Sequence, residues 1–131
     1  MLGLSFEEAE VLRERAYMFL ENSRYLMEKG FFDLAAFSLE QYCQLLLKYK
    51  LLVKTGAYPR SHSLTRLIDF LSRVEPSVRV LLEREDLLIM LTKLEDAYIG
   101  ARYLPRRYTE IEVRALYRFV VEVFQKIVEG I

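Results

Sequence analysis

Apolar residues recur at steps of three and four along most of this chain, and polar residues occupy the positions between them. This spacing is typical of amphipathic helices, and no stretch shows the alternation of a strand. Ser5 and Glu8 form a capping-box pair, which predicts that the first helix begins there and runs to about Lys29, before Gly30. The small and apolar side of this helix consists of Ala9, Leu12, Ala16, Phe19, Leu20, Ser23, Leu26 and Met27.

The second helix is predicted to begin near Phe32 and Asp33 and to end at Gly56. Glycine directly after the last periodic residue commonly ends a helix. Because the link between the first two helices is short, they are expected to be antiparallel. The predicted apolar stripe of the second helix consists of Ala35, Leu39, Tyr42, Cys43, Leu46, Tyr49 and Val53.

Pro59 forces the residue before it out of the helical region, so a third helix is expected after it. Ser61 or Ser63 is the predicted cap of this helix, which should end before Pro76. The next stretch is also apolar, but a charged cluster at residues 83–86 predicts a break between a short helix and a longer one. The apolar residues of that stretch are Val80, Leu81, Leu87, Leu88, Leu91, Leu94 and Tyr98.

Thr109 and Glu112 form a second capping-box pair and open the last predicted helix, which ends at Gly130. The predicted fold is all-α: an up-and-down bundle of about five helices, with a four-helix core plus a short helix. A chain of 131 residues is sized for one hydrophobic core. A single domain over residues 1–131 is therefore expected.

The charge balance and the single cysteine exclude several classes of protein. The 19 Lys and Arg residues equal the 19 Asp and Glu residues, so strong nonspecific DNA binding is not expected. Cys43 has no second cysteine in the chain, which excludes an internal disulfide or a multi-cysteine metal site and favours a reducing, cytoplasmic location. The N-terminal residues resemble neither a leader nor a membrane span. We expect no metal, no cofactor and no membrane partner.

The turn over residues 56–67 holds the only histidine, His62, two residues after Arg60. An imidazole, a guanidinium and the free amides of a helix N-terminus together favour an anion site. The alternative is a histidine that only caps its own turn.

A second loop, residues 101–109, gathers three arginines and two tyrosines. Guanidinium groups bind phosphate oxygens through forked donors, and tyrosine rings stack on bases. The predicted ligand contacts in this loop are Arg102, Tyr103, Arg106, Arg107 and, as a secondary candidate, Tyr108. The alternative is a solvated loop whose arginines pair with Glu95, Asp96 and Glu110.

Three polar residues of the second helix, Gln41, Gln44 and Lys48, share one edge at helical spacing. Lys48 is a candidate phosphate contact, and the two glutamines are secondary candidates. The alternative is an ordinary solvated helix face. The chain lacks a glycine-rich phosphate loop, a zinc-binding histidine pair and a nucleophile elbow, so no catalytic residue is assigned.

Three segments resemble the HEPN family, small helical domains of higher eukaryotes and prokaryotes that accompany nucleotidyltransferases. They are AAFSLEQYCQLLLKYKLL at residues 35–52, GAYPRSHSLTRLI at residues 56–68 and GARYLPRRYTEIEV at residues 100–113. The resemblance implies a bundle of about five helices, often a homodimer, that works with a separate minimal nucleotidyltransferase and binds nucleotides or RNA. By position, it assigns the family's polar positions to Lys48, His62, Arg102 and Tyr103, and its turns to Pro59 and Pro105.

The chain departs from the family at two points. Gln44 stands where many relatives have a glutamate, four residues before the lysine of the second helix. Ribonuclease members carry an arginine followed, after four to six residues, by a histidine, but the corresponding positions before His62 are Thr55, Gly56 and Ala57. The resemblance therefore implies a non-cleaving member, with no enzyme activity.

These observations lead to one functional hypothesis and two alternatives. The hypothesis is a non-catalytic module that binds a nucleotide or RNA phosphate beside a minimal nucleotidyltransferase, provided that folding brings the two loops together. The first alternative is a protein-protein interaction or dimerisation module without a ligand site. The second is a metal-independent ribonuclease with an atypical arrangement of arginine and histidine.

Overall fold

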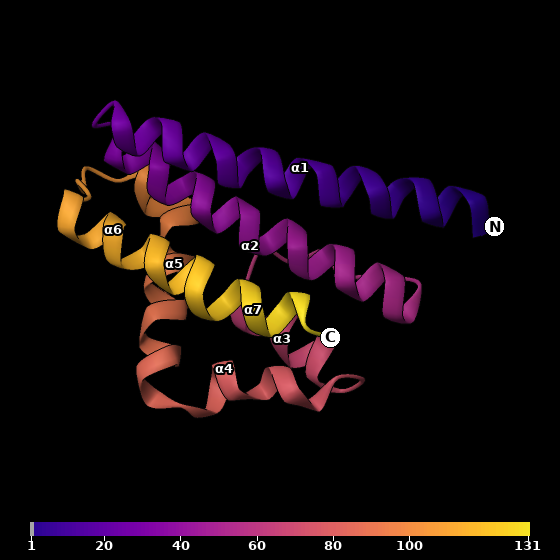
Figure 1. The fold of residues 1–131 in the computed structure, drawn as a ribbon. Helices are drawn as coiled ribbons and strands as arrows, with labels where there is room; N and C mark the ends of the chain where they lie inside the picture. Colours follow the sequence, from indigo (N-terminus) through magenta and orange to yellow (C-terminus); the bar gives the residue numbers. More distant parts are fainter. Residues whose placement is uncertain (1) are drawn as a thin grey trace.

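The computed structural model describes the backbone of residues 2–131 and the side chains of residues 6–131. Helices α1 (Leu2–Glu28) and α2 (Phe32–Thr55) form the predicted antiparallel hairpin (Figure 1). Gly30, in the turn between them, has a φ of 77°, in the left-handed region that favours glycine. Helix α1 is already formed at Leu2, before the predicted start at Ser5, whose side chain lies outside the described residues.

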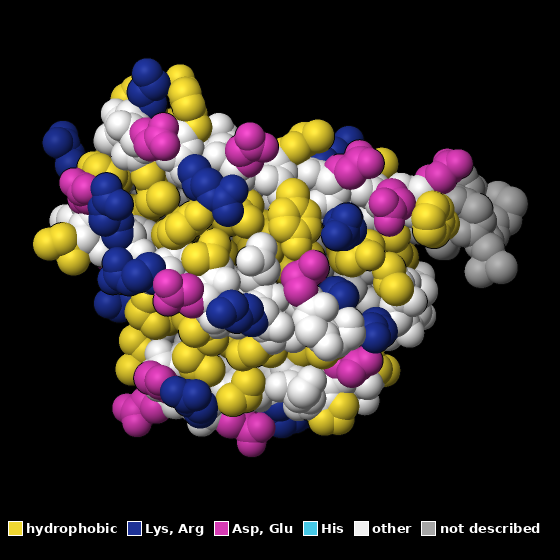
Figure 2. Space-filling model, viewed as in Figure 1, with side chains coloured by type: hydrophobic (Ala, Val, Ile, Leu, Met, Phe, Trp, Pro, Cys, Tyr) yellow, Lys and Arg dark blue, Asp and Glu magenta, His cyan; other side chains and the backbone are white. Residues whose placement is uncertain are grey.

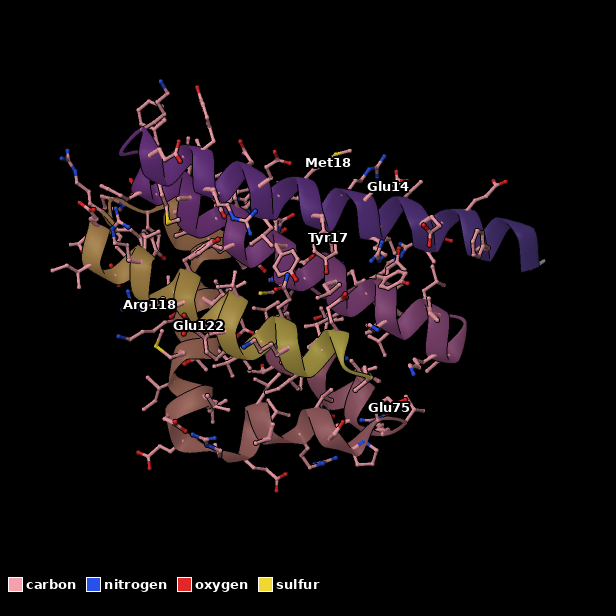
Figure 3. The ribbon with its side chains drawn as sticks, in the orientation of Figure 1. Glu14, Tyr17, Met18, Glu75, Arg118 and Glu122 are labelled. Carbon is pink, nitrogen blue, oxygen red and sulfur yellow. The ribbon has the colours of Figure 1, made fainter. Side chains whose placement is uncertain are left out.

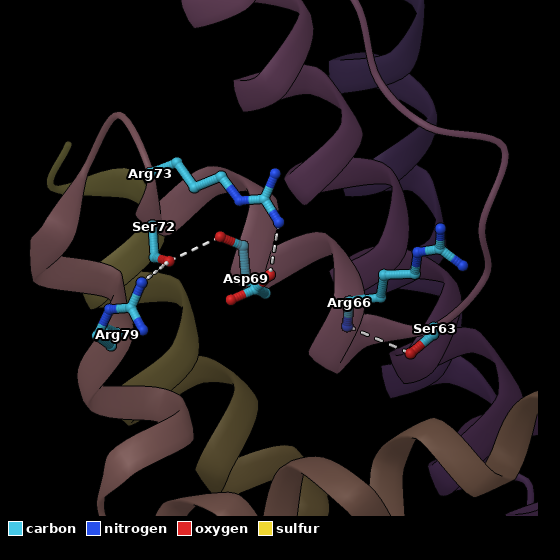
Figure 4. Close-up of polar contacts among 6 residues, drawn as sticks. All are labelled: Ser63, Arg66, Asp69, Ser72, Arg73 and Arg79. Carbon is cyan, nitrogen blue, oxygen red and sulfur yellow. Dashed lines mark hydrogen bonds and ion pairs between the residues drawn. The ribbon is translucent and has the colours of Figure 1, made fainter.

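Helix α3 (Leu64–Ser72) is fixed by polar contacts at both ends (Figure 4). At its start, the Ser63 Oγ accepts a hydrogen bond from the backbone N–H of Arg66 at 3.3 Å, so Ser63 is the cap. At its end, Arg79 Nη2 donates to the Ser72 Oγ at 3.0 Å. The predicted third helix is confirmed, and its N-terminus is anchored directly after the turn that holds His62.

The polypeptide then turns back through η1 (Pro76–Arg79) and α4 (Val80–Glu83) before the long helix α5 (Glu85–Tyr103). Arg84 lies between α4 and α5 with an extended backbone, φ −82° and ψ 124°. The predicted break inside the charged cluster is therefore confirmed.

The last helical segment comprises α6 (Glu110–Phe119), the π-helical turn η2 (Val120–Phe124) and α7 (Gln125–Glu129). Both bonds of the predicted capping box between Thr109 and Glu112 are present at its start. The π-helical turn was not predicted.

Helix α2 is the central helix of the bundle. In Figure 1, α1 runs along one side of it and α6 to α7 run across the front, while α3 and α5 also pack against it and α4 lies at the bottom of the view, against α3 and α5. Its buried residues cover more than one face: Ala35, Ala36, Ser38, Leu39, Glu40, Tyr42, Cys43, Gln44, Leu46, Leu47, Leu51 and Leu52. The predicted stripe is confirmed except for Tyr49, which is half-buried, and Val53, which is exposed. The all-α bundle is also confirmed.

No helix in the described part of the chain has the length and apolar character needed to cross a membrane.

Candidate functional site

The turn that carries His62 is anchored to both α2 and α5. The Lys48 Nζ lies over the ring of Tyr58, 5.6 Å from its centroid, and holds the turn to α2. At the other end of the turn, the Ser63 Oγ donates to the Glu95 Oε1 of α5 at 2.8 Å. The turn therefore has a defined position relative to both helices.

His62 and Arg102 meet at a third residue, Tyr98. The imidazole of His62 stacks on the Tyr98 ring with a centroid separation of 4.3 Å and an interplanar angle of 6°. The Arg102 Cζ lies 4.6 Å from the centroid of the same ring. Folding thus brings together one residue from each of the two loops that the sequence singled out.

Within residues 6–131, aromatic rings and a backbone carbonyl, and no carboxylate, hold the guanidinium of Arg102. Its Cζ lies 4.4 Å from the Phe37 centroid and 4.6 Å from the Tyr103 centroid. Nε and Nη2 donate to the Tyr98 carbonyl oxygen, and Nη1 donates to the Tyr103 Oη. Of the five N–H donors of an arginine, one on each terminal nitrogen is left for another acceptor. We call Phe37, His62, Tyr98, Arg102 and Tyr103 the aromatic platform.

A chain of hydrogen-bonded polar side chains runs along α2 beside this platform. The Lys48 Nζ donates to the Gln44 Oε1 at 3.0 Å, and the Gln44 Nε2 donates to the Glu40 Oε2 at 2.9 Å. The Gln41 Nε2 donates to the other carboxylate oxygen of Glu40 at 2.8 Å. The three predicted polar residues are therefore joined, directly or through Gln44, to a fourth, Glu40, that the sequence analysis did not single out.

Burial shifts the proton equilibria of this chain. Glu40 has no exposed surface, and desolvation raises the pKa of its carboxyl to about 7, against the opposing effects of the two glutamine donors and of Arg102. The charge of Glu95 raises this pKa further. Desolvation also lowers the pKa of the Lys48 ammonium, an effect that nearby Glu40 partly offsets. Lys48, which is linked to Glu40 through Gln44, and Arg102 therefore lie near a carboxyl whose pKa is close to neutral.

Glu95 caps α3 instead of pairing with the arginines of the second loop. Its Oε1 accepts hydrogen bonds from the Ser63 Oγ, from the Thr65 N–H at 3.0 Å and from the Thr65 Oγ1 at 3.2 Å. One carboxylate thus holds the N-terminus of α3, and the turn before it, against α5.

Glu95→Ala is expected to lower the free energy of unfolding by about 1–2 kcal/mol, because three donors lose their shared acceptor and the helix start loses a charged cap. Urea denaturation followed by circular dichroism measures this effect. The neighbouring variant Asp96→Ala, at an exposed position of the same helix, is the control and should stay within about 0.5 kcal/mol of the wild type. Equal effects of the two substitutions would contradict the capping role.

The three arginines of the second loop lie in different surroundings. Arg106 Nη2 forms an ion pair with Glu112, and its Cζ lies 3.7 Å from the centroid of the Tyr108 ring. Tyr108 is buried, burial raises the pKa of its hydroxyl, and its backbone N–H donates to the Asp33 Oδ1 at 2.7 Å. Arg106 covers the Tyr108 ring on one side, and Tyr108 also lines the cavity beside the turn between α1 and α2.

The other two predicted arginines, Arg107 of the second loop and Arg60 of the first, are exposed. Arg107 borders a shallow cavity of about 470 Å³ beside the turn between α1 and α2, together with Phe31 and Asp33. Arg60 is exposed in the first loop, two residues from the platform histidine. Within residues 6–131, neither arginine forms an ion pair. Of the four predicted arginines, Arg102 therefore belongs to the platform and Arg60 lies two residues from His62, whereas Arg106 is paired with Glu112.

Figure 2 shows the face formed by α1 and by α6 to α7, on which side chains of both charges are interspersed among hydrophobic ones. No histidine is visible on this face. Among residues 6–131, no three His, Cys, Asp or Glu side chains are grouped as metal ligands would be.

The fold and the site together define a small helical bundle whose polar residues gather at helix ends and along the central helix. The chain belongs to the HEPN family, since the model of the HEPN domain matches residues 9–131. No curated protein matches the chain at a significant level.

Proposed function

We propose that this HEPN domain is a non-cleaving module that binds the phosphate group of a nucleotide or RNA on the aromatic platform and works with a separate minimal nucleotidyltransferase. The supporting observation is the meeting of His62 and Arg102 at the ring of Tyr98. Rings offer stacking surfaces for bases, and cations beside them attract phosphate.

The donors beside the platform suit an anionic ligand. Arg102 retains two N–H donors after its contacts with Tyr98 and Tyr103. His62 and Arg60 are exposed on the adjoining turn, and the His62 ring is held by stacking on Tyr98. Because the chain carries no net charge, the attraction is local to these groups.

Arg102→Ala is expected to weaken binding of a fluorescein-labelled single-stranded RNA, and of ATP as a mononucleotide probe, by about 5- to 150-fold. Fluorescence anisotropy measures the RNA affinity and calorimetry measures the ATP affinity. Binding should weaken as salt rises. Arg114→Ala, which removes an exposed arginine of α6 paired with Glu110, is the matched control and should bind as the wild type does.

Two outcomes would contradict the proposal in different ways. If neither probe binds at low salt, the platform is not a phosphate site. In that case, a complex with the nucleotidyltransferase that survives Arg60→Ala combined with Arg102→Ala would favour a pure interaction module. If the protein degrades RNA in the presence of a chelator and His62→Ala abolishes the cleavage, the non-cleaving assignment is wrong.

A further inference from the structure

A shallow cavity of about 440 Å³ lies between the end of α2, the turn after it and the end of α3. Its walls are mostly apolar and include Leu51 of α2, Pro59 of the turn and Phe70 of α3. Val74, just after α3, also lines it and is 48% exposed. We call this depression the α2–α3 cavity. None of the platform residues lines it, so the proposed function leaves it unused.

Two guanidinium groups lie over the Phe70 ring, which forms one wall of this cavity. The Arg73 Cζ is 4.5 Å from the ring centroid, and the Arg66 Cζ is 5.9 Å from it. Figure 4 shows these two arginines at opposite ends of α3. Because both contact one ring, they lie on the same face of the helix, next to the apolar depression.

The cations around the α2–α3 cavity outnumber the carboxylates. The charged side chains that line it, contact its lining residues or adjoin them in sequence are the cations Lys48, Lys50, Lys54, Arg60, Arg66 and Arg73 and the carboxylates Glu8, Asp69 and Glu75. The whole chain carries no net charge, so this surplus is a local property of the surface.

Two of the three carboxylates already have a cationic partner. Asp69 pairs with Arg73 at 3.1 Å, and Glu75 pairs with Lys54 at 2.9 Å. Figure 3 shows Glu75 just after α3, below the end of α2. Arg60 and Arg66 are exposed and form no ion pair within residues 6–131. The positive surplus is therefore available to an acidic partner.

We propose that the α2–α3 cavity binds a short acidic segment of another protein. An apolar side chain of that segment fills the cavity, and its carboxylates pair with Arg66 and Arg73. Arg73 can bind a second carboxylate, because its bond to Asp69 uses one of the five N–H donors of a guanidinium. The apolar contact supplies most of the affinity, and the charge selects acidic partners over basic ones.

The lining favours a peptide over a nucleic acid. Leu51, Pro59 and Val74 supply aliphatic surface, which buries the apolar side chains of peptides, whereas nucleotide bases bind mainly by stacking on rings. This inference goes beyond the proposed function, because it adds a protein-binding surface made of residues outside the platform.

Selection from a phage-displayed library of random peptides, each of about twelve residues, tests the chemistry of the partner without assuming its identity. The immobilised full chain should enrich peptides that combine Asp or Glu with a leucine or an aromatic residue. Val74→Asp, at an exposed position that the fold tolerates, should enrich none of them, because it places a negative charge at the cavity. Enrichment of basic or uncharged peptides, or of no peptide, would overturn the proposal.

Charge reversal at Arg66 tests the pairing directly. Arg66→Glu should weaken binding of a fluorescein-labelled selected peptide by at least roughly tenfold in fluorescence anisotropy. The same peptide with lysine in place of its acidic residues should bind Arg66→Glu more tightly than it binds the wild type. Arg118→Glu, which changes an exposed arginine of α6 that is labelled in Figure 3, is the matched control and should bind as the wild type does. Equal affinities for wild type and Arg66→Glu would contradict the assigned contact.

Competition separates this surface from the platform. Labelled single-stranded RNA should not displace the peptide, and Arg66→Glu should leave RNA affinity within about twofold of the wild type. If RNA displaced the peptide and Arg66→Glu weakened both ligands equally, the cavity would belong to a nucleic-acid surface and the inference would be wrong. Loss of RNA binding in Arg102→Ala with unchanged peptide binding would support two separate sites, so the two proposals fail independently.

Discussion

Leu39→Ala is expected to lower the free energy of unfolding by about 2–5 kcal/mol, because it removes buried methyl groups and leaves a cavity at the centre of the bundle. Leu34→Ala, the same substitution in the same helix, should change it by about 0.5 kcal/mol or less. Leu39 has no exposed surface, whereas 48% of the Leu34 surface is exposed. Comparison of the two variants therefore separates the effect of burial on stability from the effect of helix propensity.

Urea denaturation of the two variants measures this difference, with the wild type as the reference. Both substitutions exchange leucine for alanine inside α2, so any change in intrinsic helix propensity is common to both. The midpoint should fall for Leu39→Ala with an unchanged slope. Similar midpoints for the two variants would mean that α2 is not the central helix.

The burial of α2 was only half predictable from the sequence. The periodic stripe identified Leu39 and Leu46 because a helix that packs on one side shows its apolar face at helical spacing. Leu47 and Leu51 lie off that stripe and are also buried, since helices pack against α2 on more than one side. Val53 belongs to the stripe but lies near the end of α2, and 57% of its surface is exposed.

Boundaries were predicted best where side chains cap the backbone. Ser63 and Thr109 accept hydrogen bonds from the first turns of α3 and α6; Thr109 was predicted as a cap, and Ser63 was one of two candidates, with Ser61. The π-helical turn at Val120–Phe124 was not predicted, because Leu116, Val120 and Val123 follow one another at the steps of four and three that an ordinary α-helix also shows. There Gln125 donates to the buried Tyr42 Oη at 3.0 Å, a tertiary contact that no local pattern indicates.

Two residues of the candidate site, His62 and Arg102, were predicted from the sequence, but Tyr98, which contacts both of them, was not. His62 and Arg102 were chosen for their chemistry and their places at helix ends, and the structure brings them together. Tyr98 was assigned to the apolar side of α5, since sequence spacing does not distinguish a buried ring from one that covers a neighbouring cation. Its position four residues before Arg102 was the available signal.

The ion pairs of the second loop depend on the path of the backbone. Asp96 and Glu110 were considered as partners for its arginines because they flank the loop in sequence. Arg106 instead pairs with Glu112, whose carboxylate is already turned toward the helix start by the capping box. Glu110 pairs with Arg114 on the exposed side of α6. Which carboxylate neutralises which arginine is decided by the turn, so sequence distance alone did not predict it.

The second large effect concerns Glu40. Its folded-state pKa of about 7 lies above the ordinary value of 4.5, because burial disfavours the charged carboxylate. Between these two pH values the folded protein retains a proton that the unfolded chain releases. The contribution of Glu40 to stability is therefore complete below about pH 4.5 and decreases as pH rises to about 7, by about 3 kcal/mol in total. Glu40→Gln is expected to abolish this decrease.

Urea denaturation between about pH 5 and pH 8 measures the effect as a difference between wild type and variant. Near pH 5 the two proteins should be similar, since an amide resembles a protonated carboxyl. Near pH 8 the variant should be more stable by about 2 kcal/mol, after allowance for one weakened hydrogen bond from Gln41 or Gln44. Glu21→Gln, at an exposed position of α1, controls for the loss of one carboxylate. Parallel profiles for wild type and Glu40→Gln would contradict a buried, protonated Glu40.

Glu40 also connects stability with the proposed function. Arg102 lies close enough for its charge to lower the pKa of Glu40, so the ionised carboxylate in turn weakens the attraction of Arg102 for an anion. Phosphate binding on the platform should therefore favour the protonated form of Glu40. RNA affinity of the wild type is expected to fall between about pH 6 and pH 8, and the Glu40→Gln variant should show a smaller fall. Because the two proteins differ only at position 40, the difference between their profiles isolates the part that belongs to the Glu40 carboxyl.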